Sequence, residues 1–214
     1  SGAGHSTPSK ESEIKLFVNT MIAAYNAGVT APSVSFKDKS GSKIQSVYML
    51  YDPVNHIVLD DKNNGTISVN FQADDYNVLA GGQQLCVEFY KSCADDTSGA
   101  ISVDGITGKV LRLKTDGEDG LKITDSNGNV ILPIERNGVK NCYPITNGAT
   151  YTLKYSSDEM GLFRTDTSGT ILNEGAQAST IYARVYTVYD NGSKVTPCGI
   201  AELSISAQEL FELD

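Results

Sequence analysis

Few residues in this sequence could support nucleophilic catalysis. Only two histidines occur among the 214 residues, His5 and His56. A serine or cysteine hydrolase needs a nucleophile that is held by a base and by an orienting acid. His56 is the only histidine placed to act as a base, and no Gly-x-Ser-x-Gly or catalytic cysteine motif accompanies it. We therefore expect no catalytic residue and predict that the chain is not an enzyme.

Neighbouring carboxylates, which glycoside hydrolysis would require, occur mainly in segments with turn composition. They include Asp95-Asp96, Glu118-Asp119 and Asp158-Glu159. Solvated loop charge explains these pairs without a catalytic role. The chain has no tryptophan to serve as a sugar-stacking platform, although it has 11 tyrosines that could replace one.

Calcium is the one metal for which the sequence offers a candidate loop. Asp125, Asn127 and Asn129 place oxygen donors at alternate positions, as the first half of a calcium loop does. Arg136 occupies the twelfth position, where such a loop would carry a bidentate acid. A hairpin turn explains the segment better, and the three residues stay candidates for calcium at the surface. We expect no other metal and no cofactor.

Four cysteines could form disulfides or remain thiols: Cys86, Cys93, Cys142 and Cys198. No Cys-x-x-Cys pair and no nearby histidine is present, so their spacing does not fit a zinc site. Four cysteines allow three disulfide pairings, and the sequence cannot choose among them. The alternatives are buried thiols in strands, or disulfides in an exported domain. We favour free thiols because a chain of this length can bury a core without crosslinks.

The composition is that of an acidic, folded protein. The chain has 17 basic and 26 acidic residues, a net charge of −9, and 40% hydrophobic residues. Nucleic acids and anionic lipid surfaces both require a surface rich in Lys and Arg. No apolar run approaches the roughly 20 residues of a membrane helix. We expect no nucleic acid partner and no membrane insertion by this segment.

The first part of the chain predicts a helix. Residues 1–8 are small and polar, and we expect a disordered start or a vector remnant there. Residues 9–28 have the apolar spacing of a helix, ending at Gly28. Its apolar positions are Ile14, Phe17, Val18, Met21, Ile22 and Tyr25. This face is too wide to leave in water, so we expect it to pack on the domain that follows or on the same helix of a second copy. The alternative is a helix that completes a neighbouring domain.

The remaining residues, 31–214, predict a mainly β fold, an enlarged immunoglobulin-like antiparallel β-sandwich with one N-terminal α-helix. Short Val-, Ile-, Tyr- and Thr-rich runs alternate with Asn-Gly turns, as in sandwiches. Two small sandwiches in tandem are the alternative, but no linker or repeat separates two halves. We expect long loops over Ser92–Gly105 and Ser156–Ser179. The predicted strands are Ser33–Lys37, Lys43–Tyr51, His56–Asp60, Thr66–Phe71, Gln84–Lys91, Lys109–Lys114, Leu121–Thr124, Val130–Ile134, Thr150–Tyr155, Thr180–Tyr189 and Ile200–Ala207.

The segment from Ile181 to Gly192 resembles the penultimate strand and turn of immunoglobulin-like and PKD-like modules. The positions that match are Tyr182, Tyr186, Val188, Asp190 and Gly192. Arg184 departs from the pattern, because an apolar residue is expected there. The resemblance implies an extracellular β-module, with Ile200–Ala207 as its closing strand.

A second resemblance covers both ends of the chain. The helix segment Leu16–Tyr25, followed by Ala31-Pro32-Ser33-Val34, is similar to a junction in large clostridial surface proteins whose function is not established. In that junction a helix ends an amidotransferase-like domain and β-domains of unknown function follow. The ending Glu209–Asp214 is similar to the tail of those β-domains. The resemblance implies a cell-surface location and neighbouring domains in a larger parent chain, but no ligand.

The sequence as a whole favours a non-catalytic extracellular module of a bacterial surface protein, with a structural or adhesive role. The alternative is a carbohydrate- or peptide-binding module that uses surface tyrosines and acidic loops. The tyrosines that would distinguish the two are Tyr48, Tyr51, Tyr90, Tyr155 and Tyr189. If they lined one exposed concave face, they would favour binding, whereas tyrosines distributed through the core would not.

Overall fold

A computed structural model of the chain shows a mainly β protein with two principal sheets and, among the residues it describes, one helix. These observations confirm the predicted fold class. The structure describes residues 10–27, 31–52, 57–59, 66–76, 83–93, 99–111, 121–136, 139–156, 163–165, 171–176, 179–189 and 194–209.

The smaller principal sheet has five strands and is antiparallel throughout. Its longest ladder pairs seven residues of β12 with β5, including Tyr151 opposite Phe71. In spatial order the strands are β2 (Lys43–Ile44), β1 (Ser33–Lys37), β5 (Thr66–Asp74), β12 (Thr150–Ser156) and β9 (Lys122–Thr124).

The larger sheet has ten strands. Its main path runs in the order β10 (Ile134–Arg136), β11 (Val139–Ile145), β6 (Gln84–Cys93), β15 (Ser179–Tyr189), β17 (Gly199–Glu209), β3 (Ser46–Asp52) and β4 (Ile57–Leu59). Three short strands attach beside it, β7 (Ile101–Val103), β8 (Ile106–Val110) and β16 (Lys194–Val195). A separate two-stranded sheet contains β13 (Phe163–Thr165) and β14 (Ile171–Ala176).

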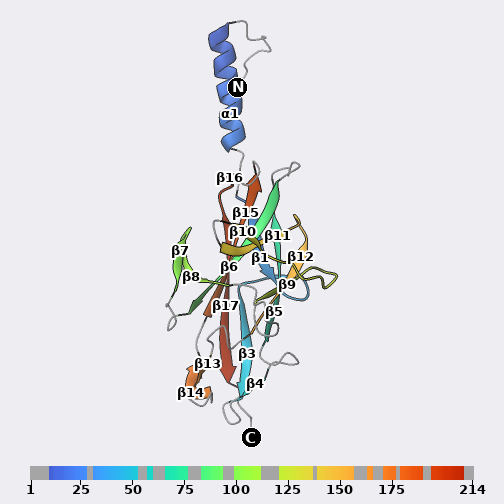
Figure 1. Cartoon of the computed structure of the whole chain (residues 1–214), viewed down its shortest axis with the longest axis vertical. Helices are drawn as coiled ribbons and strands as arrows, with labels where there is room; N and C mark the ends of the chain where they lie inside the picture. Colours follow the sequence, from blue (N-terminus) through green and yellow to red (C-terminus); the bar gives the residue numbers. More distant parts are fainter. Residues whose placement is uncertain are drawn as a thin grey trace.

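The strand order is that of an immunoglobulin-like sandwich. The order β1-β5-β12-β9 in one sheet and β6-β15-β17 in the other reproduces the A-B-E-D and C-F-G arrangement of that fold. The additional strands enlarge this framework at its edges. Both sheets combine strands from the first and second halves of the chain (Figure 1).

One pair of strands departs from the antiparallel prediction. β17 pairs with β3 in parallel, over six Cα partners from Ser204 opposite Ser46 to Glu209 opposite Tyr51. The predicted strand Lys43–Tyr51 is in fact two strands, because β2 belongs to the smaller sheet and β3 to the larger one. The chain changes sheets at Gln45, whose carbonyl accepts a hydrogen bond from the Ser204 amide at 2.9 Å.

Both predicted long loops contain strands, so the loop prediction was wrong for these parts. Ser92–Gly105 contains β7, and Ser156–Ser179 contains β13 and β14. The strand predicted at Val130–Ile134 is also displaced, because β10 begins at Ile134 and Val130 forms only an isolated bridge with Thr124. These strands are short, and pairing with a neighbour defines them more than their own composition does.

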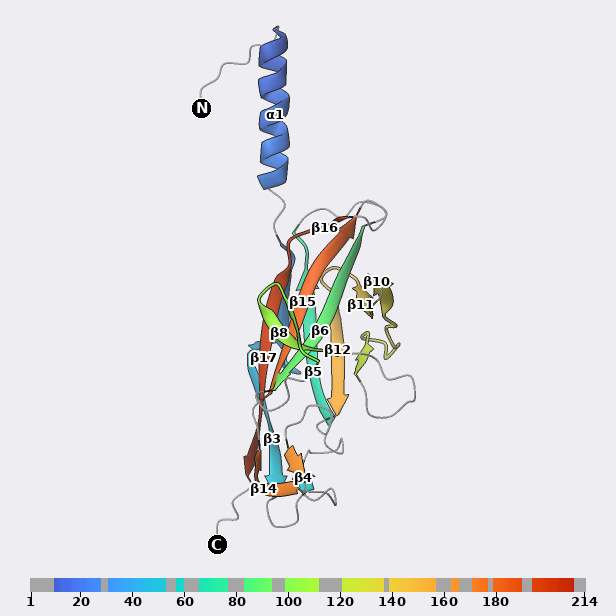
Figure 2. The same ribbon diagram turned by 60° about the vertical axis from the view of Figure 1, so that its left-hand side comes forward.

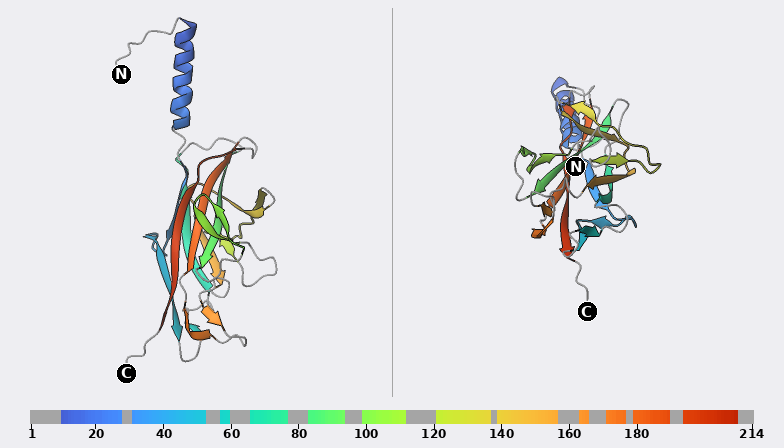
Figure 3. Two further views of the ribbon diagram at one scale, coloured as in Figure 1. Left: turned by 90° about the vertical axis from the view of Figure 1, so that its left-hand side faces the viewer. Right: turned by 60° about the horizontal axis from the view of Figure 1, so that its bottom comes forward.

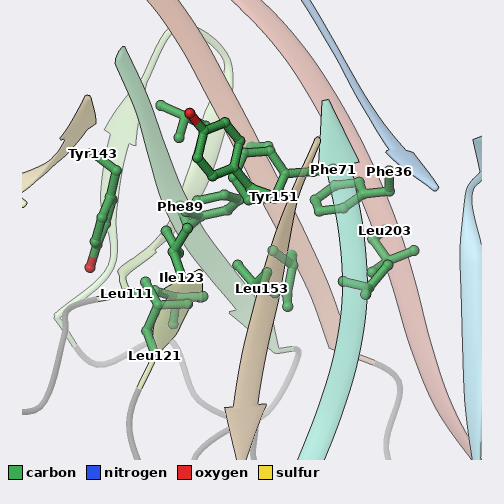
Figure 4. Packing of buried hydrophobic residues seen from close by; sticks show 14 of the residues in the cluster. Phe36, Phe71, Phe89, Leu111, Leu121, Ile123, Tyr143, Tyr151, Leu153 and Leu203 are labelled. Atoms are coloured by element: carbon green, nitrogen blue, oxygen red, sulfur yellow. The ribbon is translucent and has the colours of Figure 1, made fainter. Parts of the chain in front are cut away.

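The hydrophobic core lies between the two principal sheets (Figure 4). Phe71 on β5 is completely buried and makes an edge contact with Phe89 on β6, with ring centroids 5.2 Å apart. The Tyr151 ring stacks on Phe71 at 5.6 Å. Aromatic pairs of this kind add about 0.5–1.5 kcal/mol to the free energy gained by burial of apolar area.

The helix α1 (Glu11–Ala27) stands beyond one end of the sandwich (Figures 1 and 3). Leu16, Phe17 and Met21 are 68%, 56% and 58% exposed, so the prediction that this face packs on the β-domain was wrong for these residues, and packing on the same helix of a second copy stays a prediction. The side chains of Ile22 and Tyr25 lie outside the described residues. In the described part of the chain, no helix combines the length and apolar character needed to span a membrane.

The start of β1 approaches the start of β17 very closely. A Cβ added to Gly199 would clash with the Pro32 carbonyl oxygen, and it would lie 3.1 Å from Val185 Cγ1. Only glycine leaves room for this approach, which brings the first strand against the last one. Both strands then run toward the same end of the sandwich (Figures 1 and 2).

We predict that Gly199→Ala lowers the free energy of unfolding by about 1–3 kcal/mol, because the backbone must move to admit the methyl group. Urea denaturation followed by circular dichroism measures this change. Ser206→Ala is the control, since Ser206 is exposed on the same strand and should stay within about 0.5 kcal/mol of the original. Equal stability of the two variants would contradict the close approach.

Candidate functional site

The ladder between β6 and β15 separates the hydrophobic core from a polar cluster on the opposite face. Ten Cα pairs join the two strands. Because side chains alternate between the faces of a strand, Phe89 and Ala183 point into the core while Glu88 and Arg184 point away from it. The hairpin β7–β8 lies on this second face, and β8 pairs with the end of β6 (Figure 2).

Glu88 is the centre of the polar cluster. Its side chain is 9% exposed. Tyr186 donates to Oε1 at 2.6 Å, and Tyr90 donates to Oε2 at 2.6 Å. Arg184 Nη1 donates to the same Oε2 at 2.9 Å. The carboxylate therefore has a charge-assisted donor and two phenolic donors, which compensate for its removal from water.

Arg184 connects this buried carboxylate to the hairpin turn. Its Nε and Nη2 atoms bind Asp104 Oδ2 at 2.7 and 2.6 Å. Asp104 and Gly105 have φ angles of 46° and 85°, as the two central residues of a type I′ hairpin turn require. The turn geometry thus brings the Asp104 carboxylate against the guanidinium.

The pKa values in this cluster favour fixed protonation states. The hydrogen bond from Arg184 lowers the pKa of Asp104. Burial and then the hydrogen bond to Glu88 raise the pKa values of Tyr90 and Tyr186. Burial by itself would lower the pKa of Arg184, but Asp104 and the nearby charges leave it raised. The two tyrosines therefore stay protonated and act as hydrogen-bond donors to Glu88.

A small apolar cluster adjoins the charges on the same face. It contains Cys86, Cys142, Tyr186 and Val188, all buried, with Cys198 packed against them. The Arg184 guanidinium carbon lies 4.9 Å from the centre of the Tyr186 ring, which is a cation–π distance. The thiols and the ion pairs thus share one partly covered surface of the larger sheet.

Beside the polar cluster lies an open pocket of about 770 Å³. Strands β1, β2, β15 and β17 and the β7–β8 turn contribute to its walls. The chemically distinctive lining residues are Lys43, Asp104, Tyr182, Ile200 and Glu202. Burial and then the Glu202 charge raise the pKa of Tyr182, so its hydroxyl stays a donor. The volume lies within the range of small-molecule sites.

The calcium candidates form a tight turn in which Asp125 accepts hydrogen bonds from its own loop. Its Oδ1 accepts from the amides of Asn127 and Asn129 at 2.9 and 2.8 Å, and its Oδ2 accepts from Asn129 Nδ2 at 2.9 Å. These bonds, led by the one from Asn129, lower the pKa of Asp125. In the described ranges, no three His, Cys, Asp or Glu residues group as metal ligands would. Calcium binding at Asp125, Asn127 and Asn129 stays a prediction.

The other predicted site residues are not gathered into one surface. Tyr90 and Tyr155 are buried, whereas Tyr48 is 66% exposed and Tyr189 is half-buried. The Tyr51 side chain lies outside the described residues. The same is true of both histidines and of the acidic pairs Asp95-Asp96, Glu118-Asp119 and Asp158-Glu159.

The Glu88–Arg184–Asp104 cluster was not predicted from the sequence, although two signals for it are present. Arg184 interrupts the expected apolar face of its strand, and its place opposite Glu88 explains why. The Asp104-Gly105 dipeptide is also a hairpin signal of the same kind as Asn-Gly. Neither signal identifies its partners, which come from different parts of the chain.

No family model matches the chain, and no curated protein matches its sequence. Similar solved structures include the CssB subunit of enterotoxigenic Escherichia coli colonization factor CS6, complemented with a donor strand from CssA, at 12% identity and a TM-score of 0.35, covering 82% of this chain and 97% of that one. Murine CRIg has 10% identity and a TM-score of 0.30 over 85% of this chain and 100% of that one. The N-terminal domain of PorA has 10% identity and a TM-score of 0.32 over 82% and 98%. Similarity at this level carries no functional argument.

We predict that Arg184→Met lowers the free energy of unfolding by about 3–5 kcal/mol, because it leaves the Glu88 carboxylate buried without its cation. Adding Glu88→Gln should recover part of this loss, since the charge itself is then removed. Lys15→Met is the matched control, because its ion pair with Glu11 is 71% and 81% exposed and should contribute under about 1 kcal/mol. If Arg184→Met and Lys15→Met lowered the free energy of unfolding by the same amount, Glu88 and Arg184 would not form a buried ion pair.

The lowered pKa of Asp104 should make stability depend on acidity. A carboxyl whose folded pKa lies below its unfolded value stabilises the fold above about pH 4 and loses this contribution as the pH falls through the folded pKa. We therefore expect Asp104→Asn to lose less free energy of unfolding between about pH 5 and pH 2 than the original chain. Urea denaturation at each pH measures the slopes. Identical slopes would show that the Arg184 contact does not act on Asp104 in solution.

Proposed function

We propose that this chain is a non-catalytic extracellular module of a bacterial surface protein with a structural role, bearing mechanical load between neighbouring domains. The observation that carries the proposal is the parallel ladder between β3, near the start of the sandwich, and the closing strand β17. The chain enters the sandwich at one end, below α1, and β17 leads to the opposite end (Figures 2 and 3).

This arrangement determines how the module would resist extension. When the two ends are pulled apart and the load reaches β3 through β1 and β2, β3 and β17 are drawn in opposite directions along their common axis. All hydrogen bonds of a parallel ladder then carry the load together, whereas a hairpin pulled at its open end separates one pair at a time. Such a load requires neither a substrate nor a cofactor.

The polar cluster also supports a structural role. Each oxygen of the Glu88 carboxylate has a donor from the protein, and Arg184 holds two carboxylates at once. A catalytic acid or base needs a pKa near the working pH and access to a reacting atom. Here the pairing fixes the hairpin β7–β8 on the larger sheet instead.

Single-molecule force spectroscopy of the module within a polyprotein tests this role. We expect Ser206→Pro to lower the unfolding force, because Ser206 pairs with Tyr48 in the parallel ladder and proline removes an amide donor. Ile101→Pro is the matched control, since Ile101 pairs with Gly108 in the hairpin β7–β8 and proline removes an amide donor there, outside the line of force. With both variants folded by circular dichroism, an unchanged force for Ser206→Pro would reject the load-bearing ladder.

A second candidate function is adhesion through the pocket of about 770 Å³ beside the polar cluster. The Tyr182 hydroxyl and ring and the Glu202 and Asp104 carboxylates suit a hydroxyl-rich glycan or a basic peptide. Glycan and peptide arrays test this candidate, with Tyr182→Ala expected to remove binding and the exposed Tyr76→Ala as control, since Tyr76 is 78% exposed and does not line the pocket. Absence of a ligand on both arrays would reject the adhesive candidate.

A further inference from the structure

We propose that Cys86 and Cys142 form a disulfide that joins β6 to β11 when the chain meets an oxidising environment, and that Cys93 and Cys198 do not take part. This crosslink would lie within one chain, so its formation is independent of whether the module bears load or binds a ligand.

Strand register brings the two cysteines onto one face. Cys86 on β6 lies opposite Pro144 on β11, and Cys142 is two residues before Pro144. Residues two apart on a strand share a face, so Cys86 and Cys142 are diagonal neighbours on one face of two adjacent strands. Tyr143, between Cys142 and Pro144, points to the opposite face and into the core (Figure 4).

The two thiols are neighbours in one buried cluster. Cys86 and Cys142 are both fully buried there with Tyr186 and Val188. The interaction between the two thiols lowers the pKa of Cys142 and raises that of Cys86, so Cys142 is the first of the pair to become a thiolate. Both are free thiols in this structure.

Geometry excludes pairings with Cys93. It lies seven residues from Cys86 on the same strand and pairs with Ser179 at the far end of β15. At about 3.3 Å per residue this separation is roughly 23 Å, whereas a disulfide needs Cα atoms within about 7 Å. Cys142 is likewise near the Cys86 end of the ladder, because the β6–β11 register runs from Leu85 to Val87.

Cys198 is separated from the pair by an intervening strand. It immediately precedes β17, and β15 lies between β17 and β6. Two strand spacings amount to roughly 10 Å, beyond the reach of a disulfide. Its thiol is hydrogen-bonded to Asp104, and burial raises its pKa to about 11. Cys198 is therefore expected to remain a thiol.

Thiol–disulfide exchange with a small disulfide such as oxidised glutathione supplies the oxidant. The Cys142 thiolate attacks one glutathione sulfur, forms a mixed disulfide and releases a glutathione thiolate. The Cys86 thiolate then attacks the Cys142 sulfur and releases the second glutathione. The two cysteines lose two electrons and two protons, and one oxidised glutathione becomes two reduced ones.

The experiment is refolding of the chain in oxidised glutathione at about pH 8, where thiolates form, because both sulfurs are buried once the fold is complete. Remaining thiols are then alkylated under denaturing conditions, and proteolytic peptides are identified by mass spectrometry. We expect one crosslinked peptide pair containing Cys86 and Cys142, with Cys93 and Cys198 alkylated. We also expect the oxidised chain to melt about 5–15 °C above the reduced one.

Three serine variants complete the test. Cys142→Ser should remove both the crosslinked peptide and the rise in melting temperature, whereas the matched control Cys198→Ser should retain both. If Cys142→Ser fails to fold, Cys86→Ser tests the same pair from the other strand. Alkylation of both Cys86 and Cys142 after oxidative refolding, or a crosslink from either to Cys198 or Cys93, would overturn the proposal.

Discussion

The pairing of β6 with β15 holds the two faces of the larger sheet in one register. Its ten Cα pairs form the longest antiparallel ladder among the described strands of the larger sheet, and both of its faces are covered. On one face Phe89 and Ala183 complete the hydrophobic core. On the other, Glu88 and Arg184 lie opposite each other in register and form an ion pair. A shift of one residue would put the charges into the core and the apolar side chains outside, so the two faces specify the same register.

The Glu88–Arg184 pair need not add much net stability, because removing two charges from water costs nearly as much as their attraction returns. The ion pair instead fixes the positions of the groups around it. Arg184 holds Glu88 and Asp104 together, and so connects the middle of the sheet to the turn of a hairpin formed some eighty residues earlier in the chain. The tyrosines that donate to Glu88 give the carboxylate a single set of partners. The cluster therefore orders a face that, in a smaller sandwich, would be left to solvent.

Backbone contacts also hold the first and last strands of the fold together. The glycine at 199 lets the Pro32 carbonyl approach the beginning of the last strand, and the change of sheet at Gln45 lets β3 pair with β17 in parallel. The first and last parts of the β fold are thus bound to each other rather than only to central strands. In contrast, the exposed apolar side chains of α1 have no covering surface in the described part of the chain.

The class of fold followed from the sequence, because alternation of apolar residues and Asn-Gly turns is a local signal. The sequence predicted strands at Ser33–Lys37 and Thr180–Tyr189 to within a residue of their observed bounds. It also predicted a helix where α1 lies, since the i, i+3, i+7 spacing is local too. Which strands and side chains become partners depends on the three-dimensional fold. The parallel ladder and the contacts of Glu88 with Arg184 and of Arg184 with Asp104 all join residues distant in sequence. Their free energy comes from pairing and burial, which a local pattern does not contain.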